Sequence, residues 1–196
     1  MRIILASKSG VRKKILNDFK IDCQVVASQV DEDEVKKSLL AEGADPLIIS
    51  KNLAEIKSIK VSSKNPDRLV IGADSVISLQ DQLINKPRSR DEALSILKKL
   101  NNSVHYLITS VCISKNGAMI WNHSDSSELK MKNLTVEQLK DYLGKIDTNT
   151  LLAYGVYQIE AEGMNLFEYI KGDHNSIMGL PIKSIINYIK QFKNND

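Results

Sequence analysis

Residues 69–87, with the sequence LVIGADSVISLQDQLINKP, restrict the possible folds of this chain more than any other segment. The segment begins with a short apolar run rich in β-branched residues, which is typical of a buried strand. Gly72 and the alanine after it have almost no side chain, so another part of the protein can approach this backbone closely. Asp74 follows at once, and a turn predicted at residues 80–82 leads the chain back to Lys86. A carboxylate and a lysine are therefore expected to approach each other beside a core strand.

Asp74 has two interpretations at this stage. Burying a carboxylate costs several kcal/mol unless the group is paired or binds a metal. Asp74 therefore either has a structural role, capping a turn or pairing with Lys86, or belongs to a functional site. The segment alone favours neither interpretation.

Composition and charge exclude several classes of protein. The 196 residues are enough for one domain or two small lobes, and we expect a single domain over residues 1–196. The net charge is only +3, and the lysines are scattered among acids without a basic arm, so no nucleic-acid partner is expected. No apolar run approaches the roughly 20 residues that span a bilayer, and the N-terminal apolar run is too short for a signal peptide. Cys23 and Cys112 lack motif spacing, which indicates reduced thiols in a cytoplasmic protein.

The first residues of the chain predict a strand at residues 2–6, a loop of small residues at 7–10 and a helix at 11–19. A helix N-terminus after such a loop is a natural anion site, because its first backbone N–H groups have no partner within the helix. Arg12 and Lys13 lie in the first turn, where positive charge opposes the helix dipole. A bound phosphate would explain both cations, although exposed cations at such positions are also common.

Residues 31–34 are four consecutive acids before a helix predicted at residues 35–40. The helix dipole favours acids at a helix start, so a solvated helix terminus explains the run without any function. Alternatively, one or two of these carboxylates hold a divalent cation.

The rest of the chain predicts a mixed α/β protein, in which strands and helices alternate early and a hairpin follows. Helices are expected from Asp45-Pro46 to about residue 61 and at 182–192. Two more helices are expected to begin at the capping boxes of residues 89–92 and 135–138. Strands are expected at 21–27, 104–114 and 118–131, the last two joined at Asn116-Gly117. Two further strands, hinged at Gly163, are expected over residues 153–173. His105 is expected to be a packed strand residue, and neither it nor His123 or His174 is expected in catalysis.

Six motifs occur in order along the chain, and together they resemble the Maf family of nucleotide pyrophosphatases. They are ILASKSGVRKKIL, VDE, LAEIKS, GADSVI with NKP, HYLITSV and GDHNSIMGLPI. The resemblance implies an inosine-triphosphatase-like α/β fold, with an elongated, bent mixed sheet flanked by helices and a cleft between two lobes. It also implies a homodimer, and hydrolysis of a nucleoside triphosphate to the monophosphate and pyrophosphate with Mg²⁺ or Mn²⁺.

The resemblance also assigns roles to individual residues. Asp74 would be the proton acceptor or a metal-bound base, and Glu32 a second carboxylate at the metal. The other assigned residues share one role, contact with the triphosphate. These are Arg12, Lys57 and Lys86 as a clamp, and the loop of Ser7 and Ser9 with Lys13 as a cradle.

Three positions would surround the base, and they depart from the family pattern. By this resemblance, Val11 occupies a position where thymidine/uridine-type members have Arg and 7-methylguanosine-type members have Trp. Ser75 occupies a position where these two types have Thr or Gln. Glu160 matches the methylguanosine branch, whereas the absence of Trp at position 11 argues against stacking of a cationic base. The base preference stays open, with methylguanosine slightly favoured. Gly10 replaces the usual proline and is expected to loosen the cradle.

A different class of function is a nucleotide-binding regulator of septum formation with little or no catalysis. A pure binder has no need for a base and metal-binding acids beside its phosphate clamp. The presence of Asp74, Glu32, Lys57 and Lys86 therefore favours the enzyme.

Overall fold

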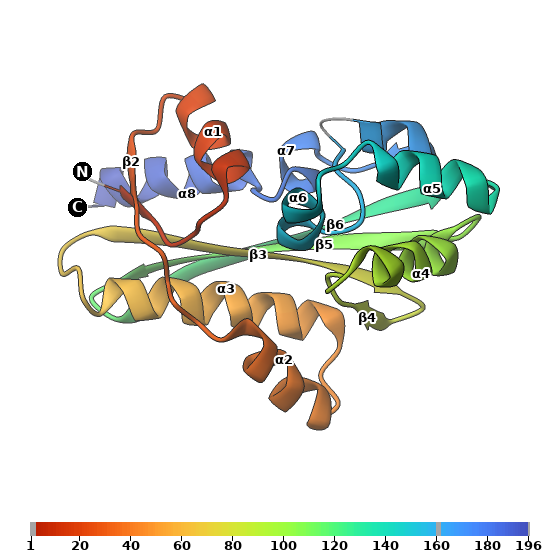
Figure 1. The fold of residues 1–196 in the computed structure, drawn as a ribbon. Helices are drawn as coiled ribbons and strands as arrows, with labels where there is room; N and C mark the ends of the chain where they lie inside the picture. Colours follow the sequence, from red (N-terminus) through yellow and green to blue (C-terminus); the bar gives the residue numbers. More distant parts are fainter. Residues whose placement is uncertain (1–2, 160–161, 196) are drawn as a thin grey trace.

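A single mixed β-sheet organises the computed structural model, which describes residues 3–159 and 162–195. The strand order is β2 (Cys23–Val25), β1 (Ile3–Leu5), β3 (Leu69–Leu79), β5 (Val104–Lys115), β6 (Ala118–Met131) and β7 (Phe167–Lys171), and β4 (Gln82–Ile84) pairs with β3. β1 runs parallel to β2 and β3, and the other pairs are antiparallel. The long strands give the molecule its elongated shape (Figure 1). The predicted mixed α/β class is confirmed.

Helices cover both faces of this sheet. α2 (Glu32–Ala41) and α3 (Pro46–Ser62) lie on one side, and α1 (Gly10–Asp18) and α8 (Ile182–Asn195) lie on the other (Figure 1). The remaining helices gather toward the other end of the long strands: α4 (Arg90–Leu100), α5 (Val136–Gly144), α6 (Thr148–Tyr154) and α7 (His174–Ile177). No described helix has the length and apolar character needed to cross a bilayer.

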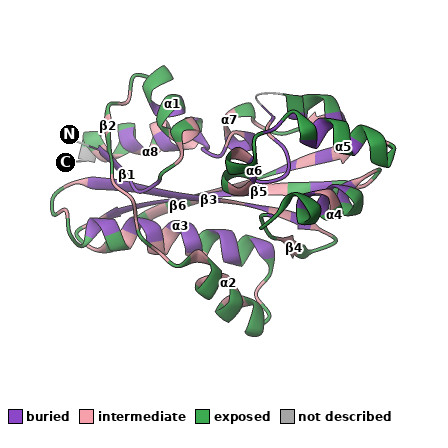
Figure 2. Cartoon of the chain, in the orientation of Figure 1, coloured by how far each residue is buried: buried purple, intermediate pink, exposed green. Residues whose placement is uncertain are grey.

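Two apolar clusters form most of the core. One joins β1, β3 and β5 to α1 and α8, and the other joins α4, α5 and α6 to the ends of β6 and β7. Burial is continuous along the first half of β3 and along the face of α3 that meets the sheet, whereas most of α2 is exposed (Figure 2). An apolar strand buried on both faces is what residues 69–71 predict.

β3 is one continuous strand, and Asp74 lies in its interior opposite Ser110 of β5. The predicted turn after it is confirmed, because Gln80 and Asp81 have φ of 52° and 60° and connect β3 to β4. Two consecutive residues with positive φ are typical of a two-residue hairpin loop. The hairpin returns the chain to Lys86, as expected.

Most elements agree with the sequence, but three do not. Residues 21–27 form a strand only over β2, and the predicted helix at 35–40 begins earlier, with Asp31 as its N-cap. Of the two strands expected over residues 153–173, the second is confirmed as β7. The first is wrong, because the described residues 153–159 contain the end of α6 and no strand, and the 3₁₀ helix Glu162–Leu166 contains Gly163. A Cβ at Gly163 would collide with the Gln158 backbone. The glycine therefore permits close packing of two chain segments.

Only one of the two predicted capping boxes forms with both of its hydrogen bonds. At α5, Thr135 and Gln138 form the full reciprocal box, as predicted. At α4, Ser89 accepts from the Glu92 N–H, but the Glu92 carboxylate accepts from the backbone N–H of Arg88. The helix start is satisfied in both cases.

Candidate active site

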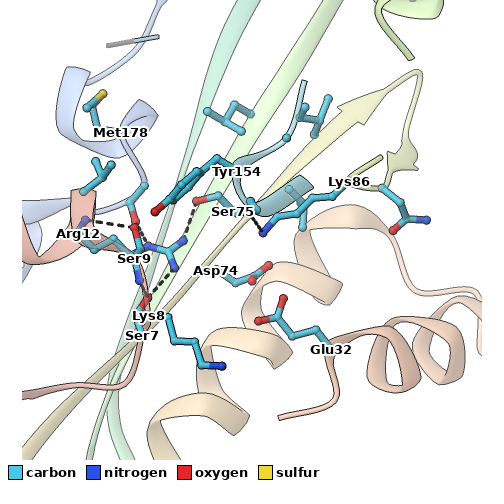
Figure 3. A pocket seen from close by; sticks show the side chains of 18 of the residues that line it. Ser7, Lys8, Ser9, Arg12, Glu32, Asp74, Ser75, Lys86, Tyr154 and Met178 are labelled. Carbon is cyan, nitrogen blue, oxygen red and sulfur yellow. Dashed lines mark hydrogen bonds between the residues drawn. The ribbon is translucent and has the colours of Figure 1, made fainter. Parts of the chain in front are cut away.

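A cavity of about 460 Å³ lies between the two apolar clusters. The loop before α1, the start of α2, the middle of β3, the segment after β4, residues 153–159 and residues 177–179 line it (Figure 3). This volume is in the usual range for small-molecule sites. Every sequence-predicted site residue except Lys13 and Glu160 lines the cavity. Lys13 is exposed outside the lining, and Glu160 lies outside the described residues.

The loop before α1 is organised by its serines. Ser7 Oγ accepts from the Ser9 N–H at 3.1 Å, and Ser9 is the N-cap of α1, with its Oγ 3.3 Å from the Arg12 nitrogen. Ser9 and Val11 line the cavity, so the N-terminal end of α1, where an anion is favoured, lies beside it. Lys8 lines the cavity beside them, a cation that the sequence analysis did not select.

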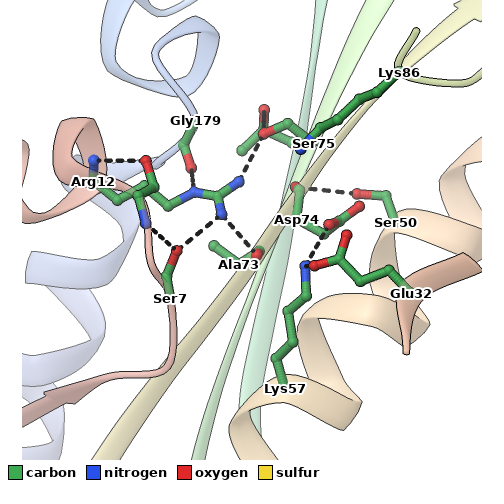
Figure 4. A network of polar contacts seen from close by, with 12 residues as sticks. Ser7, Arg12, Glu32, Ser50, Lys57, Ala73, Asp74, Ser75, Lys86 and Gly179 are labelled. Carbon is green, nitrogen blue, oxygen red and sulfur yellow. Dashed lines mark hydrogen bonds and ion pairs between the residues drawn. The ribbon is translucent and has the colours of Figure 1, made fainter. Parts of the chain in front are cut away.

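The Arg12 side chain donates hydrogen bonds to three chain segments: the loop before α1, β3 and the loop at Gly179 (Figure 4). Its Nε donates to Gly179 O at 2.8 Å, Nη1 to Ala73 O at 3.0 Å and Ser7 Oγ at 3.4 Å, and Nη2 to Ser75 Oγ at 3.2 Å. Burial lowers the pKa of Arg12, and the nearby carboxylates oppose that shift. A guanidinium has five N–H donors, so one N–H on Nη2 has no acceptor among the described residues. Arg12 can therefore offer a ligand one hydrogen bond, and most of its donors hold the site together.

Lys57 lies between two carboxylates. Its Nζ is 2.7 Å from Asp74 Oδ1 and 2.7 Å from Glu32 Oε1 (Figure 4). Desolvation raises the pKa of Glu32, but Lys57, together with Lys86 and Lys36, leaves that pKa below its usual value. The lysine expected to contact phosphate is thus committed to the two acids, and Asp74 pairs with Lys57 where the sequence suggested Lys86.

Asp74 keeps one oxygen available in this cluster. Within the described part of the chain, its buried Oδ2 has no hydrogen-bond partner. Buried carboxylate oxygens are normally satisfied, so an unpaired one in a ligand cavity indicates a group that acts on a ligand, water or metal.

Close packing of α3 on β3 brings Lys57 to Asp74. Gly72 and Asp74 share one face of β3, because strand side chains alternate. A Cβ on Gly72 would collide with the Ala54 carbonyl oxygen and lie 2.7 Å from the Ser58 nitrogen. The missing side chain at position 72 therefore sets how closely the helix carries Lys57 to the strand.

Lys86 reaches the cavity from the opposite side. Lys86 is largely exposed, but its Nζ donates to the carbonyl oxygen of Ala153, a residue of the cavity lining, at 2.8 Å. Desolvation there lowers the pKa of Lys86, while Glu32 and Asp74 oppose the shift.

The residues predicted to surround the nucleobase differ in how freely their side chains can contact a ligand. Val11 is half-buried and packs against the α1 and α8 cluster, with one side lining the cavity. Ser75 Oγ is already bonded to Arg12 and lies 3.0 Å from Thr109 Oγ1. Gly10 has open space around it, so nothing in the packing requires a glycine there.

The histidines lie outside this cavity lining. His105 is buried, with its Nε2 3.0 Å from the Tyr157 hydroxyl, which confirms the expected packed role. His123 Nε2 lies 2.8 Å from Asp125 Oδ1, and His174 begins α7. The described residues contain no cluster of three or more His, Cys, Asp or Glu that could hold a metal.

This fold and cavity define an α/β protein whose site combines cationic side chains with a pair of carboxylates. The chain belongs to the Maf-like protein family, whose model matches residues 2–192. The family resemblance inferred from the six motifs is therefore confirmed.

Several relatives are similar over nearly the whole chain. A protein of Pelagibacter ubique (strain HTCC1062) named nucleoside triphosphate pyrophosphatase is 57% identical over 191 residues, covering 97% of this chain and 98% of the relative. A 7-methyl-GTP pyrophosphatase of Brucella abortus is 33% identical, covering 98% of this chain and 97% of the relative. Among solved structures, a HAM1 protein from Coxiella burnetii has a TM-score of 0.44 and 14% identity, covering 68% of this chain and 74% of that chain.

Proposed function

We propose that this chain is a nucleoside triphosphate pyrophosphatase that hydrolyses its substrate to the monophosphate and pyrophosphate, as a housekeeping enzyme of nucleotide pools. Family membership and the 57% identical relative of that name support this class. The observation that carries the proposal is the unpaired Oδ2 of Asp74 in a cavity that also holds phosphate-binding groups.

In this proposal, the positively charged groups of the cavity hold the triphosphate. Lys8 and Lys86 line the cavity beside the N-terminal end of α1, and Arg12 adds one N–H. Positioned donors stabilise charge that develops on phosphate oxygens during attack at phosphorus. We assign the phosphates to these groups, and we assign Lys57 to orienting the two carboxylates.

Asp74 is assigned as the general base. Its Oδ1 is fixed by Lys57, and its Oδ2 remains free to accept a proton from the attacking water. A general base must lie within hydrogen-bond reach of the proton that it removes. A carboxylate held at one oxygen and open at the other fits that requirement.

A divalent cation, Mg²⁺ or Mn²⁺, fits the residues present. Mg²⁺ is usually bound through one or two carboxylates together with substrate phosphates, and Glu32 and one lone pair of Asp74 Oδ2 would provide such oxygens, which leaves the second lone pair of Oδ2 for the proton. When bound, the cation would supply neutralisation of phosphate charge and acidification of a water molecule. In this proposal Lys8 and Lys86 hold the phosphates, and Lys57 holds the Asp74 carboxylate in place.

The test is a panel of ordinary and modified nucleoside triphosphates with Mg²⁺ or Mn²⁺, in which pyrophosphate and orthophosphate are measured separately. Pyrophosphate release in amounts equal to the monophosphate is expected for one or a few bases. 7-Methyl-GTP belongs in the panel because relatives carry that substrate in their names. Orthophosphate as the only product would overturn the proposal, and binding without product would favour the regulator of septum formation.

Three accompanying proposals concern assembly and location. A homodimer, a single domain and a cytoplasmic site of action are supported by the family resemblance and, for location, by the two free cysteines. Light scattering after size-exclusion chromatography tests the dimer directly.

A further inference from the structure

Tyr154 is an aromatic residue exposed inside the cavity. It is the last residue of α6, its side chain is 49% exposed, and it points into the cavity with its hydroxyl toward the Arg12 side (Figure 3). Within residues 3–159 and 162–195, its ring has no aromatic partner and its hydroxyl no hydrogen bond. The other aromatic residue of the lining, Tyr157, is buried and has its hydroxyl 3.0 Å from His105 Nε2. Tyr154 therefore has an aromatic face available for a ligand.

The backbone under Tyr154 is well fixed. Asp147 caps the start of α6, Leu151 is fully buried, and the N–H of Gly155 donates to Leu151 O at 3.0 Å. Gly155 has φ of 100°, a conformation in which glycine ends a helix without strain. A tyrosine on such a terminus has only two side-chain torsions to restrict, so a ligand orders it at low entropic cost.

Lys86 connects Tyr154 to the phosphate end of the cavity. Its ammonium donates to the carbonyl of Ala153, the residue before Tyr154. A phosphate held by Lys86 thus lies next to the backbone that carries the aromatic ring. Apolar side chains also line the cavity, among them Met178 and Val11. Phosphates are attracted to the cations, which leaves the base of a nucleotide to meet Tyr154 and these apolar groups.

We infer that Tyr154 contacts the nucleobase and stacks on it, and so is a specificity-determining residue of the site. The inference rests on the proposed function, because it takes a nucleoside triphosphate as the ligand. Stacking on an aromatic ring tolerates every base, and a larger ring system or a delocalised positive charge strengthens it. Purines gain more than pyrimidines, and a cationic purine gains most. α6 thus supplies an aromatic face that Val11 does not provide.

The test compares a nucleotide with a ligand that has no base. Pyrophosphate release is measured from purine and pyrimidine triphosphates for the wild type and for Tyr154→Ala, Tyr154→Phe and Tyr154→Trp. Inhibition by inorganic tripolyphosphate is measured in the same variants. We expect Tyr154→Ala to raise KM for a purine triphosphate roughly tenfold, while tripolyphosphate inhibition stays within about twofold. Tyr154→Phe should retain wild-type KM, and Tyr154→Trp should lower it.

Tyr106→Ala is the matched control, because Tyr106 is 42% exposed on β5 and lies outside the cavity lining. It should leave KM unchanged. An unchanged KM in Tyr154→Ala, or an equal loss of tripolyphosphate inhibition, would overturn the inference and leave the proposed function intact. If the wild type releases no pyrophosphate, the proposed function fails. In that case, the affinities of wild type and Tyr154→Ala for a purine triphosphate and for tripolyphosphate are compared. A loss of affinity for the nucleotide alone would support base contact by Tyr154, and an equal loss or no loss would overturn it.

Discussion

The ammonium of Lys57 lies 2.7 Å from Oδ1 of Asp74, and both side chains are buried. Because the same ammonium is 2.7 Å from Glu32, one positive charge is shared by two acids. The cluster keeps a net negative charge beside an unpaired carboxylate oxygen. This arrangement suits attraction of a cation and acceptance of a proton, and it makes the two carboxylates depend on the lysine.

Lys57→Met should therefore destabilise the protein strongly. Removing one partner of a buried ion pair leaves an uncompensated charge, which typically costs about 3–5 kcal/mol. Urea unfolding should show that loss, and the double variant Lys57→Met, Asp74→Asn should recover a large part of it. A double variant whose loss equals the sum of both single losses would show that the two residues are not coupled.

Asp74→Asn should abolish pyrophosphate release and leave nucleotide affinity within roughly tenfold of wild type, because an amide keeps the shape but cannot accept the proton. Turnover and a binding titration are the two measurements. Asp141→Asn, an exposed change on α5 outside the cavity lining, is the control and should have normal turnover. Normal turnover in Asp74→Asn would remove that residue from its assigned role.

The sequence predicted the elements that depend on local patterns. The apolar run of β3, the β5–β6 hairpin and the Thr135 capping box each follow from neighbouring residues. The acid and lysine of residues 69–87 were also correctly expected to share one region. These features need no knowledge of distant contacts.

The sequence could not predict contacts that depend on long-range packing. The pairing of Lys57 with Asp74 results from the close approach of α3 at Gly72, and a glycine in a strand pattern does not name its neighbour. α6 was missed because seven residues are too few to show a helical period. Tyr154 was missed with it. The roles of the cavity residues stay predictions until they are measured.

Lys86 should make substrate binding weaken at alkaline pH. The lysine attracts phosphate while it is protonated, which is the case below its pKa, and desolvation lowers that pKa. KM should therefore rise as pH increases through this lowered pKa, earlier than for an ordinary lysine. KM measured from pH 7 to 10 tests this. Lys86→Arg should remove the rise, because arginine stays protonated throughout. A rise of the same size in that variant would assign it to another group.

His105 should reduce stability in mild acid. Desolvation lowers the pKa of this buried histidine to about 4, against an ordinary value near 6.5. Between these values the histidine binds a proton in the unfolded chain but not in the folded protein. The stabilising contribution of neutral His105 is therefore complete above about pH 6.5 and is lost as pH falls toward 4. The free energy of unfolding should fall by about 2 kcal/mol more between pH 7 and 5 in the wild type than in His105→Phe. Equal slopes in the two proteins would contradict this account.

Gly72→Ala should impair both stability and turnover, because it separates the helix from the strand where Lys57 meets Asp74. The new methyl group would collide with the Ala54 carbonyl and lie 2.7 Å from the Ser58 nitrogen, and backbone atoms cannot move aside independently. Overpacking of this kind costs about 1–3 kcal/mol, and displacement of a site residue by about 1 Å can cost a factor of about 100 in rate. Gly144→Ala is the matched control, since a Cβ there meets nothing within 4 Å, and it should change stability by less than about 0.5 kcal/mol. If Gly72→Ala lost stability but kept wild-type turnover, the spacing between α3 and β3 would be separable from the chemistry, and Lys57 would need no fixed distance to Asp74.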